Sequence, residues 1–246
     1  MRALYSQFIH RVKHSCLHLF YPTCCLHCQS LLNPSEAILC PDCSQLLEMI
    51  DPIDCCAICF NVLAHDEYSP CQECRKIPQL YHRMGAVFDY QGPASSLIQS
   101  LKYGNQPYLA KGMAAFLFAQ IQNLQWPLPD ALVPVPLSWM RWLQRGYNQT
   151  HLIAEELSLF IQRPVLNVLG RRSGDHRQAM LNYQQRQTLK SENFQLLDHK
   201  KIQDKVIWVI DDVMTTGTTL RCCAETLCEA GPKHLYGLTF CRTLQF

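Results

Sequence analysis

The sequence lacks three features that would assign the chain to a common class of protein. No apolar run approaches the ~18 residues that a membrane-spanning helix needs. Neither a GxxxxGKS/T nor a GxGxxG motif is present, which excludes the P-loop and dinucleotide-binding fingerprints. The formal net charge is only +2, so no overall attraction to nucleic acid or to a membrane surface is predicted.

Residues 1–20 also lack the apolar core of a signal peptide, because charged residues interrupt them. We therefore expect a cytoplasmic protein. The pattern of this segment is that of a basic amphipathic helix, with apolar side chains on something like one face. Such a face usually packs against the body of its own protein, and peripheral attachment at the inner membrane is the alternative.

Cysteine, in contrast, is abundant: the chain has 15, and ten of them lie between positions 24 and 74. Eight form two CxxC-x11-CxxC patterns that repeat with a shift of 31 residues. Each pattern brings four thiolates within reach of one metal ion, as in a structural zinc site with no open position. The expected ligands are Cys25, Cys28, Cys40 and Cys43 for one zinc ion and Cys56, Cys59, Cys71 and Cys74 for the other.

Three alternatives remain for these cysteines. Disulfides are one, and a reducing cytoplasm disfavours them. Cys24 and Cys55 each precede the first ligand of a set and could compete for its position. A crossed pairing of the CxxC pairs also stays open.

Residues 206–220, reading VIWVIDDVMTTGTTL, combine three signals. The apolar run 206–210 fits a strand buried on both faces, as in a parallel sheet. Asp211 and Asp212 are expected at the end of this strand, and a loop of small hydroxyl residues follows. A helical pattern then continues until Gly231 and Pro232. Further strands are predicted at 85–90, 165–169 and 235–241, and a helix at about 107–122. Residues 131–136 are expected to form a short strand that ends in a proline-stiffened loop.

This order of strand, acidic pair, loop and helix predicts a phosphate ligand. Backbone N–H groups and hydroxyls at a helix N-terminus bind phosphate, and ligands of open α/β sheets lie beyond the carboxyl ends of the strands. The alternative is an ordinary turn with a threonine N-cap and two solvated aspartates. One threonine would suit that alternative, but four threonines and a glycine suit it poorly.

Positive charge is concentrated locally, since residues 141–190 hold eight Lys and Arg against three acids. Arg141 and Arg145 closely follow the proline-stiffened segment 131–136. Guanidinium groups make bidentate contacts that suit a diphosphate, although a solvated helix face would also explain them. The polar stretch 170–194 is long for a simple connection, which favours a functional role.

Taken together, these motifs resemble the ComF family, also called GntX-like. The resemblance rests on the cysteine repeat, on VPVPL, RGYNQ and IDDVMTTGTT, and on the spacing of Arg172, Gln178 and Leu181. It covers about residues 15–244. It implies an α/β fold of the type I phosphoribosyltransferase kind, with a mostly parallel sheet, helices on both faces and a preceding double zinc ribbon. We therefore expect an N-terminal helix over 1–20, the double zinc ribbon over 21–80 and a phosphoribosyltransferase-like domain over 81–246, with a flexible hood at about 170–194.

The resemblance also implies a site for phosphoribosyl pyrophosphate (PRPP) with Mg²⁺. Asp211 and Asp212 would be the catalytic pair that holds the ribose hydroxyls. The other residues implied for PRPP are the loop Thr215, Thr216, Gly217, Thr218 and Thr219, and the diphosphate side Pro134, Val135, Arg141, Arg145 and Lys102.

The function implied by the resemblance is a competence protein for natural transformation, which handles incoming single-stranded DNA with partners of the DNA-uptake machinery. A basic groove with a stacking platform would serve that function, and its candidates are Arg145, Arg171, Arg172, Arg177 and Trp142. An active phosphoribosyltransferase, displacing pyrophosphate from PRPP with a base or amine, stays open as the alternative. No residue in the sequence identifies the acceptor.

Overall fold

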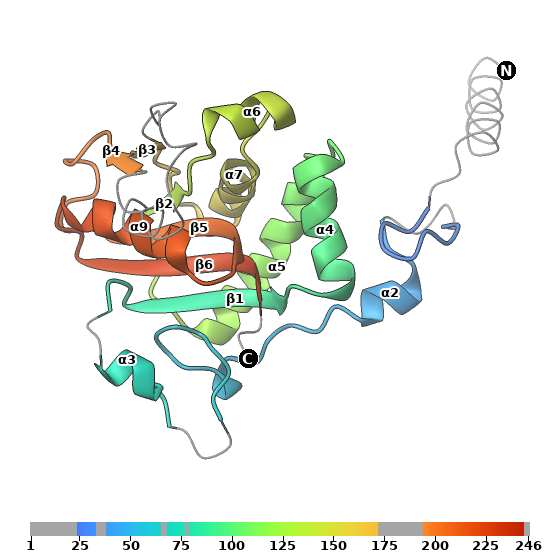
Figure 1. The fold of residues 1–246 in the computed structure, drawn as a ribbon, viewed down its shortest axis with the longest axis horizontal. Coiled ribbons are helices and arrows are strands. Elements are labelled where there is room, and N and C mark those ends of the chain that lie inside the picture. The colour runs from blue at the N-terminus through green and yellow to red at the C-terminus, as the bar shows by residue number, and fades with distance from the viewer. Residues whose placement is uncertain (1–23, 33–37, 65–67, 77–78, 172–193, 244–246) are drawn as a thin grey trace, which may run out of the picture.

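The structure is a computed structural model that describes residues 24–32, 38–64, 68–76, 79–171 and 194–243. Its centre is a four-stranded parallel sheet with the order β1-β6-β5-β2 (Figure 1). The strands are β1 (Arg83–Asp89), β2 (Ala131–Pro134), β5 (Val206–Met214) and β6 (His234–Arg242). In the described part of the chain, no helix is both long and apolar enough to cross a membrane.

Helices cover both faces of this sheet. The first face packs against α4 (Gly92–Tyr103), α5 (Leu109–Leu124) and α7 (Gln149–Ile161), and the second against α9 (Thr218–Cys228). Strand β5 shows why, because Trp208 and Ile210 join the core of the first face, whereas Ile207 and Val209 join that of the second. This alternation of fully buried side chains confirms the predicted parallel sheet with helices on both faces.

Strand β5 is longer than the sequence predicted. It was expected to end at Ile210, but it runs to Met214, because β6 continues to pair with it as far as Arg242. The backbone N–H of Thr243 then donates to the Met214 carbonyl over 2.9 Å. Asp211 and Asp212, which were expected at the end of the strand, therefore lie within its last part, where the ladder fixes their backbone.

Residues 165–169 are described in the structure, but they do not form the predicted strand. Val165 makes one isolated bridge to Leu132. The next strand, β3 (Leu169–Arg171), pairs antiparallel with β4 (Phe194–Leu196) in a separate two-stranded sheet. These two strands hold the ends of the predicted hood. Residues 172–193, and the predicted helix over 1–20, lie outside the described residues.

The cysteine-rich part precedes the sheet and contains α2 (Pro41–Gln45), the 3-10 helix η1 (Pro52–Asp54) and α3 (Gln72–Lys76). Two backbone bonds join it to β1. Ile50 N–H donates to the Val87 carbonyl over 2.8 Å, and Met84 N–H donates to the Ile58 carbonyl over 2.7 Å. Helix α6 (Trp139–Arg145) follows β2 and has no buried residue (Figure 1).

Candidate phosphate site and metal centres

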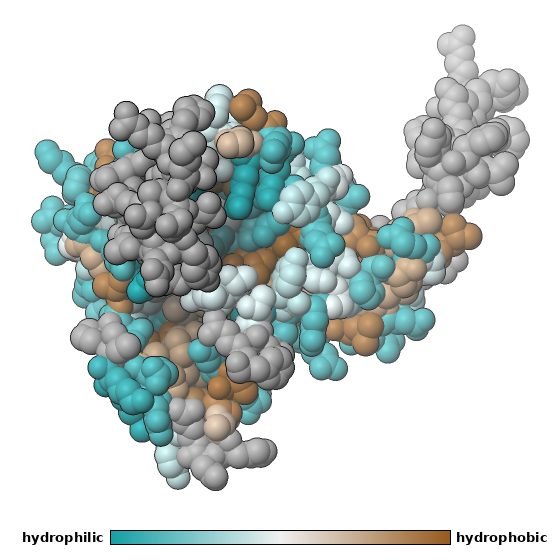
Figure 2. Space-filling model, viewed as in Figure 1, coloured by the Kyte–Doolittle hydropathy of each residue, from teal (hydrophilic) through white to brown (hydrophobic). Residues whose placement is uncertain are grey.

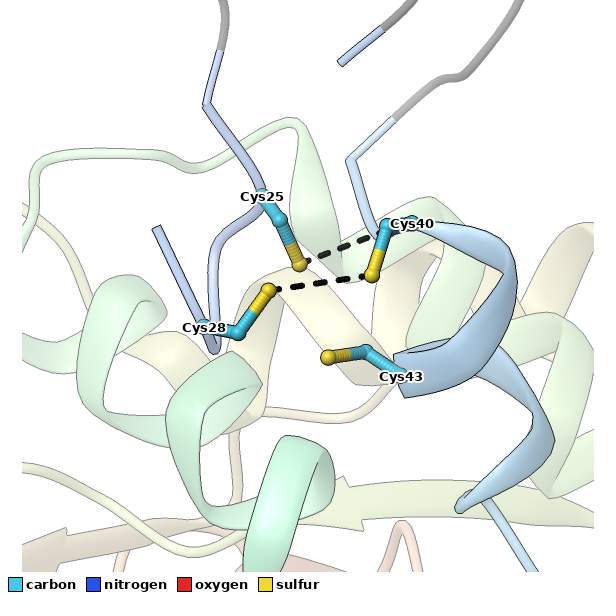
Figure 3. A group of neighbouring side chains, drawn as sticks. All are labelled: Cys25, Cys28, Cys40 and Cys43. Atoms are coloured by element: carbon cyan, nitrogen blue, oxygen red, sulfur yellow. Dashed lines mark hydrogen bonds between the residues drawn. The ribbon is translucent and has the colours of Figure 1, made fainter. Parts of the chain in front are cut away.

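The eight predicted cysteine ligands lie in two groups of four, in sequential pairing. Within each group the sulfur atoms lie within 4.8 Å of one another. Figure 3 shows the four side chains of the first group pointing toward a common centre. The contacts repeat between the groups: Cys28 and Cys40 sulfurs are 3.7 Å apart, as are those of Cys59 and Cys71. The duplicated sequence thus forms a duplicated structure.

The donor set of each group fits zinc. Four thiolates form the closed, sulfur-only environment of a structural zinc site. Burial would raise the pKa of Cys25, but backbone N–H groups of Cys40, Cys28 and His27 lower it to about 6. The pKa of Cys56 is lowered to about 7 against the same effect of burial. One thiol of each group is thus prepared to bind a metal ion as a thiolate.

Cys24 and Cys55 lie outside both groups. The Cys55 thiol donates to the Asp51 carbonyl over 3.6 Å and accepts from Arg242 Nη1 over 3.2 Å. Cys24 forms an isolated backbone bridge with Leu31. The CxxC spacing therefore identifies the candidate metal ligands correctly. The cysteine that precedes each set makes other contacts and is not part of either group.

A cavity of about 450 Å³ lies at the carboxyl ends of β2 and β5. Two elements that are distant in sequence complete its wall, the end of α4 and the inner side of α6. Of the residues predicted for the ligand site, those that line it are Lys102, Val135, Arg141, Arg145, Arg171, Asp211, Asp212, Thr215 and Thr219. Pro134 is buried within β2 and is not among the described lining residues.

The two aspartates of this cavity differ in their surroundings. Asp212 accepts from Lys102 Nζ at Oδ1 over 2.7 Å and from Gln149 Nε2 at Oδ2 over 2.6 Å. Asp211 Oδ1 accepts only the backbone N–H of Asp212, over 2.9 Å, among the contacts described. Burial, and then the charge of Asp212, raise the pKa of Asp211 to about 8. Near neutral pH the pair therefore holds one carboxylate in an ion pair and one mostly protonated carboxyl group.

Two buried polar atoms at this cavity have no hydrogen-bond partner among the described residues. They are Gln149 Oε1, an acceptor, and Arg145 Nη1, a donor. The orientation of the Gln149 amide follows from its bond to Asp212, because its oxygen would repel the carboxylate. Buried polar groups are nearly always paired, so these two atoms are prepared for a ligand with both hydroxyl donors and anionic acceptors.

Hydrogen bonds fix the loop after β2, on the basic side of the cavity. The Val135 carbonyl accepts from Thr150 Oγ1 over 2.6 Å and from Asn148 Nδ2 over 3.1 Å. The Pro136 carbonyl accepts from Arg171 Nε over 3.0 Å. Burial lowers the pKa of Arg171, but an arginine keeps its charge at physiological pH. The guanidinium of Arg171 therefore has a fixed position in the cavity wall.

The threonine loop stands between two cavities. Thr215 and Thr219 line the first, whereas Thr216, Gly217 and Thr218 line a second cavity of about 620 Å³ together with Thr215. Gly217 has a φ of 69° and is the N-cap of α9, without a side-chain cap. Only glycine adopts this conformation at little cost, and it leaves the first N–H groups of the helix open to an anion.

The residues proposed for nucleic acid are only partly placed. Arg145 and Arg171 line the cavity, so one set of charges faces both proposed ligands. Trp142 lies on α6, where its ring stacks on Trp139 with centroids 5.2 Å apart and 13° between planes. Figure 2 shows hydrophobic surface where α6 lies. Arg172 and Arg177 are outside the described residues.

Sequence reasoning missed the contacts of two residues that line the cavity, Gln149 and Tyr103. Gln149 was noted only as part of the RGYNQ motif, yet it holds Asp212. Its position follows from Asn148, whose side chain caps α7 by accepting from Thr150 N–H over 3.2 Å. Tyr103 was not singled out, but its hydroxyl accepts from Arg145 Nη2 over 3.3 Å. An N-cap signal before a polar residue could have indicated the first of these.

The fold and the two cysteine groups define the class of the protein: an α/β fold of the type I phosphoribosyltransferase kind, preceded by a cysteine-rich region with two potential zinc sites. No family model matches the chain. Competence protein F of Haemophilus influenzae is 29% identical over 88% of this chain and 95% of its own length. DNA utilization protein YhgH of Salmonella typhi is 28% identical over 92% and 100%. Competence protein ComFC of Streptococcus pneumoniae is 26% identical over 83% and 88%.

These homologues confirm the resemblance to the ComF family that the motifs predicted. Among solved structures, glutamine PRPP amidotransferase from B. subtilis, complexed with ADP and GMP, is similar with a TM-score of 0.41 and 15% identity. The likeness covers 57% of this chain and 30% of that chain.

Proposed function

We propose that the chain binds Mg-PRPP in the cavity of Asp211 and Asp212, and that it handles incoming single-stranded DNA in the cytoplasm. Partners of the DNA-uptake machinery, and peripheral attachment at the inner membrane, belong to the same proposal. The names of its homologues, competence proteins and a DNA utilization protein, support the biological role. The geometry of the cavity supports the small-molecule ligand.

One observation carries the proposal of PRPP: the unpaired Gln149 Oε1 and Arg145 Nη1 lie in the wall of one cavity. A ribose hydroxyl would donate to the first, and a diphosphate oxygen would accept from the second. The volume of about 450 Å³ is within the usual range of small-molecule sites. A phosphorylated sugar with a diphosphate group offers hydroxyl donors and anionic acceptors as separate groups, so it can satisfy both atoms at once.

Each wall of the cavity has a separate part in holding PRPP. Asp212 and Asp211 would accept hydrogen bonds from the ribose hydroxyls. The N–H groups at the start of α9 would donate to the 5′-phosphate. Arg141, Arg145 and Arg171 would hold the diphosphate, where Mg²⁺ bound with the ligand supplies further charge neutralisation. The ion pair with Lys102 fixes the position of the Asp212 carboxylate.

A direct test measures binding of Mg-PRPP and of single-stranded DNA at two salt concentrations. We expect Asp211→Asn/Asp212→Asn to lose most PRPP affinity. The neighbouring acids Glu155 and Glu156 on α7 offer a matched control, and Glu155→Gln/Glu156→Gln should bind as the wild type does. Unchanged PRPP affinity in the aspartate variant would refute the site. DNA affinity that does not fall with salt would refute the basic groove.

An active phosphoribosyltransferase is the second candidate, because arginines and the acidic pair line the same cavity. Transfer would break the bond between the ribose anomeric carbon and the diphosphate and form a bond to an acceptor nitrogen. Positioning and charge stabilisation supply most of the catalysis in such a reaction. Pyrophosphate release from Mg-PRPP, measured with a panel of bases and amines, tests it. If no base or amine of the panel raises the rate of pyrophosphate release above the rate without an acceptor, the transferase function is refuted and only the binding function remains.

A further inference from the structure

The two four-cysteine modules are equivalent in sequence but differ in packing. Buried residues of the first form a small cluster of their own, which includes Cys25 and Leu32. The second contributes Cys55 and Phe60 to the main core. Gln29 and Phe60 are equivalent in the repeat and both have positive φ, 63° and 60°. The side chain of Gln29 is exposed, whereas Phe60 is only 2% exposed.

A buried arginine at the end of β6 holds the second module to the sheet. Arg242 is 4% exposed, and its Nε lies 2.9 Å from Asp89 Oδ1. Its Nη1 donates to the Phe60 carbonyl and, over 3.2 Å, to Cys55 Sγ. The guanidinium also lies 5.2 Å from the centroid of the Phe60 ring. A buried cation needs all of these partners, so the second module and the end of β6 are held in one arrangement relative to each other.

The same strand end adjoins the phosphate loop. Arg242 pairs with Met214 in the ladder of β5 and β6, and Thr243 N–H donates to the Met214 carbonyl over 2.9 Å. Thr215, the first residue of the loop, follows Met214 directly. Thr215 and Thr243 both line the PRPP cavity. A shift of Arg242 would therefore move the point from which the loop starts.

We propose that the second four-cysteine module positions the phosphate loop, with Arg242 as the positioning residue. Metal bound by Cys56, Cys59, Cys71 and Cys74 would fix the Phe60 carbonyl, which fixes Arg242 and, through it, the end of β5. The first module contacts α4 instead, where His27 Nδ1 lies 2.9 Å from Ser96 Oγ. Among the described contacts of Arg242, none reaches the first module. The identity of the ligand rests on the proposed function, but the coupling between the second four-cysteine module and the phosphate loop does not.

The repeat provides a matched pair of variants, Cys59→Ser and Cys28→Ser, at equivalent positions. Each should retain one zinc ion by native mass spectrometry. We expect Cys59→Ser to bind Mg-PRPP about two- to thirtyfold more weakly than wild type, and Cys28→Ser to remain within about twofold. Hydrogen exchange of the amides from 215 to 220 should accelerate in Cys59→Ser alone. Equal behaviour of the two variants in this exchange would overturn the inference.

Arg242→Lys tests the connection between the second module and the phosphate loop while both sets of cysteine ligands are intact. If Cys59→Ser does not fold, this variant tests the proposal in its place. Lysine can keep an ion pair with Asp89 but lacks the fork that reaches Phe60. We expect faster exchange at 215–220 with two zinc ions retained, and wild-type exchange in the control Arg83→Lys. Wild-type exchange in Arg242→Lys would overturn the role of Arg242. If the wild type does not bind PRPP, the proposed function is refuted. Hydrogen exchange at 215–220 in the variants would still test whether the second module positions the phosphate loop.

Discussion

Lys102 Nζ lies 2.7 Å from Asp212 Oδ1, in an ion pair between the end of α4 and the end of β5. The side chains are 19% and 7% exposed, so water screens this pair weakly. Gln149 occupies the other carboxylate oxygen of Asp212. The acidic group of the site is thus held in place by the chain itself before a ligand arrives.

Removing the cation of this pair should destabilise the protein. In Lys102→Met, the buried carboxylate of Asp212 loses its partner, and we expect a loss of about 3 kcal/mol in the free energy of unfolding. Chemical denaturation measures this loss. The double variant Lys102→Met/Asp212→Asn should recover part of it, because no uncompensated charge remains. If the double variant is as unstable as the single one, the charge of Asp212 is not the cause.

Asp211 should make stability depend on pH. Its carboxyl group has a pKa of about 8 in the folded chain, against 3.8 as the ordinary value. Between these values the folded state keeps a proton that the unfolded state has lost, so the free energy of unfolding falls as pH rises. Thermal unfolding at several pH values from about 5 to 8 should show a weaker decline in Asp211→Asn.

A suitable control for the pH series is Asp198, whose pKa is lowered by a hydrogen bond from Lys201. Asp198 is already ionised in both states above its ordinary pKa of 3.8. Asp198→Asn should therefore keep the decline of the wild type over the same pH interval. A decline that is identical in Asp211→Asn and wild type would contradict the protonation of Asp211.

Two zinc ions per chain are expected from the two groups of four cysteines. Native mass spectrometry counts them, and a strong chelator should remove both. Because Cys55 and Phe60 beside the second group belong to the main core, chelation should lower the melting temperature of the sheet domain. A single zinc ion, or none with disulfides present, would contradict the assignment. Full stability after removal of both ions would contradict a structural role.

Trp142 on α6 should contribute to single-stranded DNA binding and not to PRPP binding. A base stacked on an aromatic side chain contributes about 1–3 kcal/mol, so Trp142→Ala should weaken DNA binding by about five- to 150-fold. Fluorescence anisotropy with a labelled oligonucleotide measures it. Tyr108, another exposed aromatic residue, gives the control variant Tyr108→Ala. A loss of equal size in both variants would show that Trp142 has no specific part.

The sequence was sufficient for the features that depend on local pattern. The two sets of cysteine ligands follow from spacing, and the buried strand of β5 follows from an apolar run. The end of β5 could not be predicted, since it depends on pairing with β6, which begins 20 positions after Met214 in the chain. Gln149 and Tyr103 were missed for the same reason. Their roles come from contacts with Asp212 and Arg145, and neither contact leaves a periodic trace in the sequence.

Gln29 and Phe60 show what became of the two halves of the repeat. Gln29 lies at the surface, and the first module contacts the sheet domain only through partly buried side chains and the bond of His27 to Ser96 among the contacts described. Phe60, in contrast, places an aromatic ring of the second module within the main core. The copies are therefore not interchangeable. A chimera with the first knuckle in place of the second would still chelate its ion, but it would put an amide where the core needs a ring and would leave Arg242 without its aromatic partner.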